Sequence, residues 1–249
     1  MDTVQKLIKN WTDGAEKYST SVKEEMATFQ KQAWTGIILE NAGGTGSMDI
    51  LDVGTGPGFF AVILSLAGHR VRGIDCTEAM LAEARANAAE AGVSPEFSLS
   101  DSHDLPFADN SFDLVVSRNV AWTLLDADKA FAEWLRVLRP GGRTLIFDAN
   151  WNLYLFDEEQ KRKNDADIAA YRETFNEDPA GYTHDGLDYR RSMPMCRRRR
   201  PQWDLGALVD AGFVRLVCET NINERVYDAK RKVLYRSTPM FMIAAEKAG

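Results

Sequence analysis

The sequence has few of the residues and segments that mark secreted, membrane-spanning or metal-binding proteins. Its three cysteines, Cys76, Cys196 and Cys218, are widely separated and odd in number, so neither a disulfide framework nor a metal site is predicted. The longest apolar run, at residues 59–68, is too short to cross a bilayer and predicts a buried helix. The first residues lack the basic start and apolar stretch of a signal peptide, so we expect a cytoplasmic protein with no membrane partner.

Positive charge is in deficit too, with 37 acidic against 30 basic side chains and a formal net charge of −7. A chain of this charge repels a phosphate backbone, so no nucleic acid partner is expected. Residues 189–201 are a local exception, because they hold six arginines and no acid. This stretch, with the run 197–200, is either a solvated strip paired with acidic helices or a place where arginine binds a carboxylate or phosphate. The sequence leaves both readings open.

From residue 48 onward, strand patterns alternate with helix patterns. Helices are predicted over 58–68, 78–92, 126–139 and 203–211, and Pro140, Gly141 and Gly142 are expected to end the third of them. Strands are predicted over 48–53, 69–75, 95–100, 111–117, 142–150, 213–221 and 239–245. This alternation predicts an α/β fold: a doubly wound, mainly parallel, seven-stranded sheet with helices on both faces.

Four parts of the chain differ in pattern. Residues 1–46 predict an N-terminal helical arm, with a helix over 15–41, and residues 47–150 predict the core of the sheet. Residues 151–201 interrupt the alternation and predict an inserted cap, after which 202–249 complete the sheet. Because an insertion after the fifth strand overhangs the carboxyl edge where ligands bind, the cap is expected to select the substrate. Its aromatic residues fit either a ligand pocket or the small core of the cap.

Three glycines, Gly54, Gly56 and Gly58, stand in LDVGTGPGFF where the first strand passes into a helix. Such a turn directs backbone N–H groups into the crevice beyond the carboxyl end of the sheet. A nicotinamide dinucleotide site would read GxGxxG, but Phe59 occupies the third glycine position. Taken alone, the turn fits a bound ligand or an ordinary tight turn.

Two carboxylates follow the next two strands at the same edge. Asp75, at the end of the second strand, is able to accept hydrogen bonds from both hydroxyls of a ribose, although a charge favoured by a helix N-terminus explains it equally well. Asp101, after the third strand, is able to accept a hydrogen bond from an adenine amino group. Together they indicate an adenosine-type ligand.

Four motifs, LDVGTGPG, GIDCTEAML, DSHDLPFADNSFDLVVS and LRPGGRTLIFD, stand in this order and together resemble the class I S-adenosylmethionine-dependent methyltransferase family. The resemblance is to its small-molecule branch of the methyltransferase type 11 kind, and it covers residues 48–149 strongly and 203–246 loosely. It implies a Rossmann-like methyltransferase fold with S-adenosyl-L-methionine as the cofactor. The implied reaction is methyl transfer to a small organic acceptor by direct displacement.

The resemblance also implies where the cofactor lies. The implied contacts run from the methionine portion to the adenine: the methionine portion at Asp52, Gly54, Thr55, Gly56 and Gly58, its amino acid group at Arg118 and Asn119, the ribose at Asp75, the adenine at Cys76, Met80, Asp101 and Ser102, and an aromatic lid at Tyr18.

No catalytic residue follows from the sequence. Transfer from a sulfonium depends on alignment and exclusion of water, and a general base is needed only if the nucleophile arrives protonated. The candidates are His184, Trp122 and Tyr18, although Trp122 fits a core position equally well. An arsenic-type methyltransferase that uses the three cysteines is disfavoured, because Cys76 is explained as a neighbour of the adenine.

Two other functions remain as alternatives. One is a module that binds S-adenosylmethionine or S-adenosylhomocysteine without turnover, and the other is a nicotinamide-dependent enzyme, against which Phe59 and residues 101–120 argue. The stretch SRNVAW after the fourth strand differs from the Asn/Asp-Pro-Pro-aromatic sequence of enzymes that methylate base amino groups. The acceptor, its nucleophilic atom and the oligomeric state are open, and an anionic acceptor fits the arginine-rich stretch.

Overall fold

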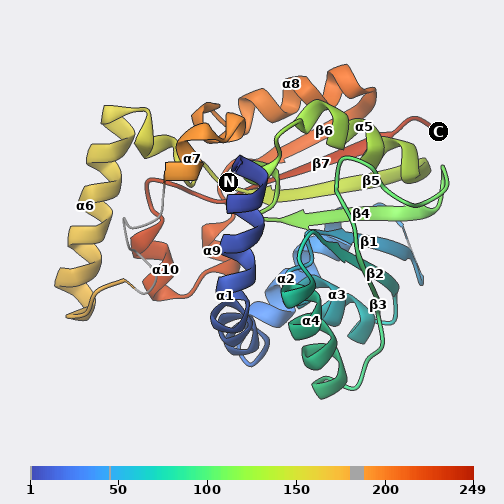
Figure 1. The fold of residues 1–249 in the computed structure, drawn as a ribbon, viewed down its shortest axis with the longest axis horizontal. Helices are drawn as coiled ribbons and strands as arrows, with labels where there is room; N and C mark the ends of the chain where they lie inside the picture. Colours follow the sequence, from blue (N-terminus) through green and yellow to red (C-terminus); the bar gives the residue numbers. More distant parts are fainter. Residues whose placement is uncertain (1, 45, 180–187) are drawn as a thin grey trace.

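A single seven-stranded sheet organises the chain, as Figure 1 shows for the computed structural model, which describes residues 2–44, 46–179 and 188–249. The strand order is β3-β2-β1-β4-β5-β7-β6. The first five strands run parallel and β7 runs antiparallel to both of its neighbours. The strands are β1 (Asp49–Val53), β2 (Arg70–Asp75), β3 (Glu96–Leu99), β4 (Phe112–Arg118), β5 (Leu138–Asp148), β6 (Phe213–Glu219) and β7 (Phe241–Lys247). The predicted fold class is confirmed.

Both faces of the sheet are buried, which explains the nearly continuous apolar character of β1, β4 and β5. On one face, α2 (Gln30–Asn41) and α3 (Phe59–Leu66) cover the strands, and Trp34, Phe60 and Phe147 meet with ring centroids 5.1–5.6 Å apart. On the other face, α5 (Ala127–Val137) and α8 (Gln202–Ala211) pack against Leu51, Val115 and their neighbours.

The strand order reverses direction between β1 and β4, which are hydrogen-bonded neighbours with Val53 paired to Ser117. The crossovers from these two strands leave on opposite sides of the sheet, so a crevice opens beyond their carboxyl ends. The glycine turn after β1 and the residues Arg118 and Asn119 at the end of β4 therefore lie at the same edge.

The N-terminal arm consists of two helices, α1 (Thr3–Met26) and α2, so the prediction of one helix over 15–41 is wrong. The helix is interrupted around Thr28, whose hydroxyl donates to the Glu25 carbonyl and accepts from the Gln30 N–H. Helix α1 begins well before residue 15 because Val4, Leu7, Ile8 and Trp11 have the i, i+3, i+4, i+7 spacing of a helix face.

The predicted end of the third helix is also wrong. Helix α5 ends at Val137, and Pro140, Gly141 and Gly142 belong to β5 instead. Leu138 already pairs with Phe112, and the register then shifts, so that Leu114 faces Arg143. The proline and glycines thus form an irregular strand start, because pairing with β4 takes over before the helix reaches them.

The cap has two segments rather than one. Residues after β5 form η2 (Leu153–Leu155), α6 (Glu158–Phe175), α7 (Asp188–Ser192) and η3 (Pro194–Arg197). Between β6 and β7, where no element was predicted, lie α9 (Asn223–Val226) and α10 (Ala229–Leu234). Ile168 and Tyr171 of α6 pack on Leu234 of α10, so the two segments share a small core. No helix in the described ranges is both long and apolar enough to cross a membrane.

We expect Phe147→Ala to lower the free energy of unfolding by about 3–5 kcal/mol, because it opens a cavity among three packed rings. Urea denaturation measures this change. Phe156→Ala is the control, since that side chain is 38% exposed, and it is expected to cost far less. Equal losses from the two substitutions would contradict the assignment of Phe147 to the core.

Candidate functional site

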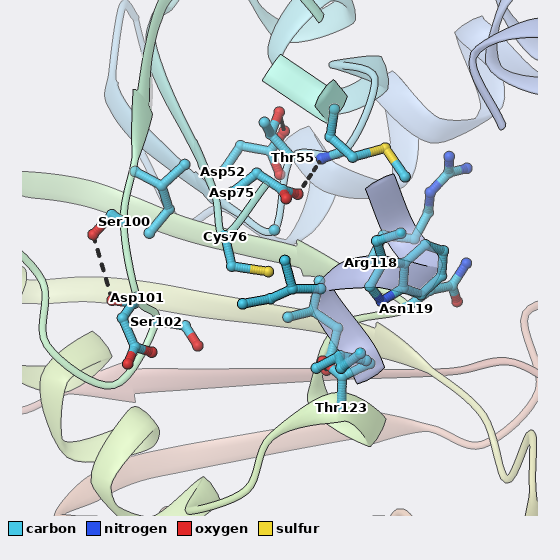
Figure 2. Close-up of a pocket in the computed structure, with 18 of the residues that line it drawn as sticks. Asp52, Thr55, Asp75, Cys76, Ser100, Asp101, Ser102, Arg118, Asn119 and Thr123 are labelled. Carbon is cyan, nitrogen blue, oxygen red and sulfur yellow. Dashed lines mark hydrogen bonds between the residues drawn. The ribbon is translucent and has the colours of Figure 1, made fainter. Parts of the chain in front are cut away.

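A cavity of about 490 Å³ lies at the carboxyl edge of β1, β2 and β4, with α1 along one side (Figure 2). Its wall contains every predicted cofactor residue except Gly58: Tyr18, Asp52, Gly54, Thr55, Gly56, Asp75, Cys76, Met80, Asp101, Ser102, Arg118 and Asn119. Figure 2 shows Asp101 and Ser102 on the side opposite Arg118 and Asn119. Residues from five separate segments of the chain therefore meet around one space.

The glycine turn is needed for close packing as well as for its backbone shape. Gly54 and Gly56 have φ of 65° and 53°, which other residues rarely adopt. A Cβ on Gly54 would come within 2.3 Å of Val120, and one on Gly56 would meet the Tyr18 ring at 3.4 Å. Gly58 lies outside the cavity wall, and a Cβ there would meet Ala84 of α4 (Glu78–Glu90) at 3.1 Å. Its absence of a side chain lets α3 pack on α4.

Asp52 is a buried carboxylic acid directly behind the turn. Its Oδ2 accepts hydrogen bonds from Thr55 Oγ1 at 2.6 Å and from the Ala61 N–H at 3.1 Å. Burial raises the pKa of Asp52 to about 7, against the opposing effects of the Thr55 hydrogen bond and the charge of Arg118. Near neutral pH the charged and the protonated form of Asp52 are therefore both populated.

Asp75 is tied to the same turn from the end of β2. Its Oδ2 accepts from the Gly56 N–H at 3.0 Å, and its Oδ1 accepts from the N–H and the hydroxyl of Thr77, each at 2.9 Å. Burial raises the pKa of Asp75, although these hydrogen bonds oppose the shift. The carboxylate is held in one orientation at the cavity wall, and Oδ2, which accepts a single bond, keeps capacity to accept a further one.

At the far end of the cavity, Asp101 and His103 form a pair. The Asp101 Oδ1 accepts from the His103 N–H at 2.9 Å and lies 2.6 Å from His103 Nδ1. Burial opposes ionisation of Asp101, but its bonds to His103 outweigh it and hold the pKa of that carboxyl below its usual value. Burial also raises the pKa of the nearby Cys76 thiol to about 12, so this cysteine is neutral and unsuited to thiolate chemistry.

Arg118 links the cavity to the arm and the cap. Its Nη1 lies 2.7 Å from Glu25 Oε2 of α1, and Arg231 of α10 bonds the other oxygen of the same carboxylate. The Arg118 guanidinium also lies 4.5 Å from the centroid of Phe59. Burial would raise the pKa of Glu25, but Arg118 and Arg231 outweigh it and hold that pKa below its ordinary value. The resemblance implied that Arg118 and Asn119 contact the amino acid group of the cofactor, and the sequence did not single out Glu25 or Arg231.

The arm is fastened over the cavity at further points. Asn87 of α4 donates from Nδ2 to the Ser19 hydroxyl of α1 at 3.1 Å and to the Pro57 carbonyl of the glycine turn at 2.9 Å. Lys23 pairs with Glu90 at the surface. Near the other end of α1, the hydroxyls of Thr3 and Ser192 are 3.1 Å apart, which joins the arm to the cap.

The three catalytic candidates have different surroundings. Tyr18 lines the cavity and faces Gly56. Trp122, in η1 (Ala121–Thr123), is 6% exposed and packs with Leu7 and Tyr189 away from the cavity wall, which is a core position. His184 falls outside the described residues. Asn119 has a left-handed backbone, and its buried Oδ1 accepts no hydrogen bond from the described part of the chain.

A family model described as a methyltransferase domain matches residues 51–146. The chain is 35% identical over 125 residues to a ubiquinone/menaquinone biosynthesis C-methyltransferase of Desulfotalea psychrophila, covering 49% of this chain and 50% of that protein. It is 39% identical over 101 residues to a demethylmenaquinone methyltransferase of Thermus thermophilus, covering 40% and 46%. The chain spans about half the length of the curated relatives it matches.

Residues 51–146 therefore form a methyltransferase domain of the kind implied by the resemblance to the class I S-adenosylmethionine-dependent methyltransferase family. The predicted resemblance and cofactor are thereby confirmed. Solved structures agree in fold. A Haemonchus contortus phosphoethanolamine N-methyltransferase 2 in complex with S-adenosyl-L-methionine superposes with a TM-score of 0.65 at 20% identity, over 96% of this chain and 60% of that one. The YcgJ protein of Bacillus subtilis gives 0.54 at 19% identity, over 86% and 97%.

We expect Glu25→Gln to lower the free energy of unfolding by about 3–5 kcal/mol, because two buried guanidinium groups lose their shared carboxylate. Since the pKa of Glu25 is lowered on folding, its contribution is present above the unfolded value of about 4.3 and is lost as pH falls through the folded value. Urea denaturation from pH 3 to 8 measures this difference. Glu24→Gln is the control on the exposed face of α1, and a loss equal to that of the control would contradict the linkage.

We expect S-adenosylhomocysteine to bind the chain about tenfold more tightly at pH 8 than at pH 6, because a ligand ammonium group at Asp52 favours the charged form of this carboxyl, whose pKa is about 7. Calorimetric titration across this range tests the expectation. Asp52→Asn is expected to bind more weakly and with little dependence on pH. The same pH dependence in that variant would show that another group is responsible.

Proposed function

We propose that the chain transfers a methyl group from S-adenosylmethionine to a small organic acceptor. The observation that carries the proposal is the convergence of the glycine turn, Asp75, Asp101 and the end of β4 on one cavity beneath α1. The resemblance to the methyltransferase family implies a cofactor contact for each of these segments. The methyl donor supplies a good leaving group, and the protein supplies position and shelter from water.

In the proposed arrangement, the ribose hydroxyls donate to Asp75, whose carboxylate is already oriented by Gly56 and Thr77. The adenine amino group donates to Asp101, at the end of the cavity where Cys76 and Met80 also lie. The cofactor ammonium is received by Asp52 and by the Asn119 Oδ1, which is buried and accepts no bond from the described residues. This orientation directs the methyl group toward Tyr18 and the cap.

Alignment is proposed as the main source of rate acceleration. Well-oriented reactants gain up to about 7–11 kcal/mol over free encounter in favourable cases. Tyr18, which lies on the glycine turn, adds a cation–π contact of about 0.5–2 kcal/mol to the sulfonium. His103 lines the cavity but is paired with Asp101 at the adenine end, so it is not placed to deprotonate an acceptor. The proposal therefore favours a nucleophile that arrives with a free lone pair.

The acceptors named for the relatives do not carry over directly. The relatives named above act, by their names, on a carbon of a quinone precursor or on the nitrogen of phosphoethanolamine. The matched segment, residues 51–146, contains every predicted cofactor residue except Tyr18 and neither cap segment. Helices α6, α7 and α10 lie outside this matched segment, so the names of the relatives do not identify the acceptor. We infer that the acceptor is small and organic.

A binding module without turnover is the second candidate, and it is favoured because no general base is identified among the described residues. Incubation with S-adenosylmethionine and a panel of amine, thiol, phenol and carboxylate acceptors separates the two functions. Release of S-adenosylhomocysteine that depends on one acceptor supports the methyltransferase. Tight cofactor binding with no release from any acceptor supports the binding module.

We expect Asp75→Ala to weaken binding of S-adenosylhomocysteine by about tenfold to a hundredfold, since hydrogen bonds to a charged group contribute about 1.5–3 kcal/mol each. Calorimetry with S-adenosylhomocysteine and with NADH, in parallel, measures the affinities. Asp104→Ala removes an exposed carboxylate from the loop after β3 and is expected to bind as the unchanged chain does. Binding of NADH in place of S-adenosylhomocysteine would overturn the proposed function.

A further inference from the structure

The six arginines of residues 189–201 differ in their surroundings. Arg200 is buried between two carboxylates, Asp148 and Asp204. Arg191, Arg197, Arg198 and Arg199 are exposed. Their contacts are a carbonyl, an aromatic ring or, for Arg199, the carboxylate of Asp157. The solvated strip is therefore an accurate description of four of the six.

Arg190 is the exception, because it is half-buried and no ion pair joins it to a carboxylate among the side chains that the structure describes, which exclude those of residues 180–188. Its guanidinium lies 5.7 Å from the centroid of the Trp122 ring and 5.9 Å from that of Tyr189. Its Nη1 donates to the Asn152 Oδ1 at 3.3 Å, and its buried Nε donates to no described atom. A guanidinium held between rings, with one nitrogen bonded to an amide and no carboxylate partner among the described side chains, keeps its buried Nε available to a ligand.

Two more buried donors accompany Arg190. The hydroxyl of Tyr189, which is 5% exposed, and the Nδ2 of Asn152, which is 2% exposed, find no hydrogen-bond partner among the described residues. Folded proteins rarely leave such groups unpaired. All three unmet atoms are able to donate, so a group with several acceptor oxygens satisfies them together.

This cluster adjoins the cofactor cavity. Leu7 packs with Trp122 and Tyr189, and the Trp11 ring lies 6.3 Å from that of Trp122. Leu7 and Trp11 both line the cavity from α1. Figure 1 shows α7 beside the N-terminal end of α1, on the side of the cap. The three donors are thus separated from the cofactor cavity by one layer of side chains.

We propose that Arg190, Tyr189 and Asn152 form the subsite for an anionic oxygen group of the methyl acceptor, a carboxylate or a phosphate. This rests on the proposed function, because it places the acceptor between the cap and the cofactor. The charged group binds at α7, and the nucleophile extends from there past Trp122 toward the methyl group. Arg190 sets specificity and does not touch the reacting atoms.

The test uses the full chain saturated with S-adenosylhomocysteine, titrated with inorganic phosphate and separately with acetate at constant ionic strength adjusted with chloride. Trp122 lies under the guanidinium, so tryptophan fluorescence is a suitable readout beside calorimetry. The variants are Arg190→Gln and Arg190→Lys. Arg198→Gln is the matched control, because it removes the same charge from the same stretch at an exposed position.

The unchanged chain and the Arg198→Gln control are expected to bind one or both anions saturably. In Arg190→Gln the affinity is expected to fall by about tenfold or more, as for loss of a charge-assisted hydrogen bond. Arg190→Lys, which keeps the charge without the fork, is expected to bind in between and guards against a folding defect in the glutamine variant. Binding of phosphate alone indicates a phosphorylated acceptor, and binding of acetate alone indicates a carboxylic acid.

Unaltered anion binding in Arg190→Gln, or no saturable binding of either anion by the unchanged chain, would overturn this subsite. The affinity for S-adenosylhomocysteine, measured first on every variant, distinguishes failure of the anionic subsite from failure of the proposed function. If the unchanged chain does not bind S-adenosylhomocysteine, the proposed function fails. If cofactor binding is normal and the anions fail, only the anionic subsite is lost.

Discussion

The carboxylate of Glu25 is the contact on which the arrangement of the site depends. It joins α1, the end of β4 and α10, three segments that no other single side chain holds together in the described structure. Burial disfavours its charge, and two guanidinium groups on either side restore it. Because such a group is costly to bury alone, each of the two ion pairs contributes to the stability of the other. The position of the arm over the cavity therefore depends on α10 as well as on β4.

The part of the site that could be predicted from the sequence is the part built from local signals. The glycine turn, Asp75 and Asp101 each sit at the end of a strand, and parallel strands bring their carboxyl ends to one edge. The apolar runs and the glycines are enough to place them. Twelve of the thirteen expected cofactor residues line the cavity for this reason. Gly58 does not, because it lies where α3 packs on Ala84 of α4.

The part that was missed depends on contacts between distant residues. Glu25 and Arg231 are 206 positions apart, and neither stands in a motif. The helices α9 and α10 are only four and six residues long, too short for a periodic pattern. They are stabilised by tertiary packing, α10 on α6 and α9 against α2. Among six arginines in one stretch, only the folded structure distinguishes Arg200, which is buried in an ion pair, from Arg190, whose buried Nε donates to no described atom.

Charge balance connects the arm to the chemistry. The cofactor is a sulfonium cation, and Arg118 lies in the wall of its proposed cavity. An unneutralised guanidinium there would repel the cation, since like charges repel strongly where water is excluded. Glu25 offsets part of the charge of Arg118, which it shares with Arg231, and the carboxyl of Asp52, with a pKa of about 7, adds a negative charge when it is ionised. The closed arm therefore does more than exclude water: it makes the cavity electrostatically suited to a cation, while leaving the positive charge of Arg190 for the acceptor.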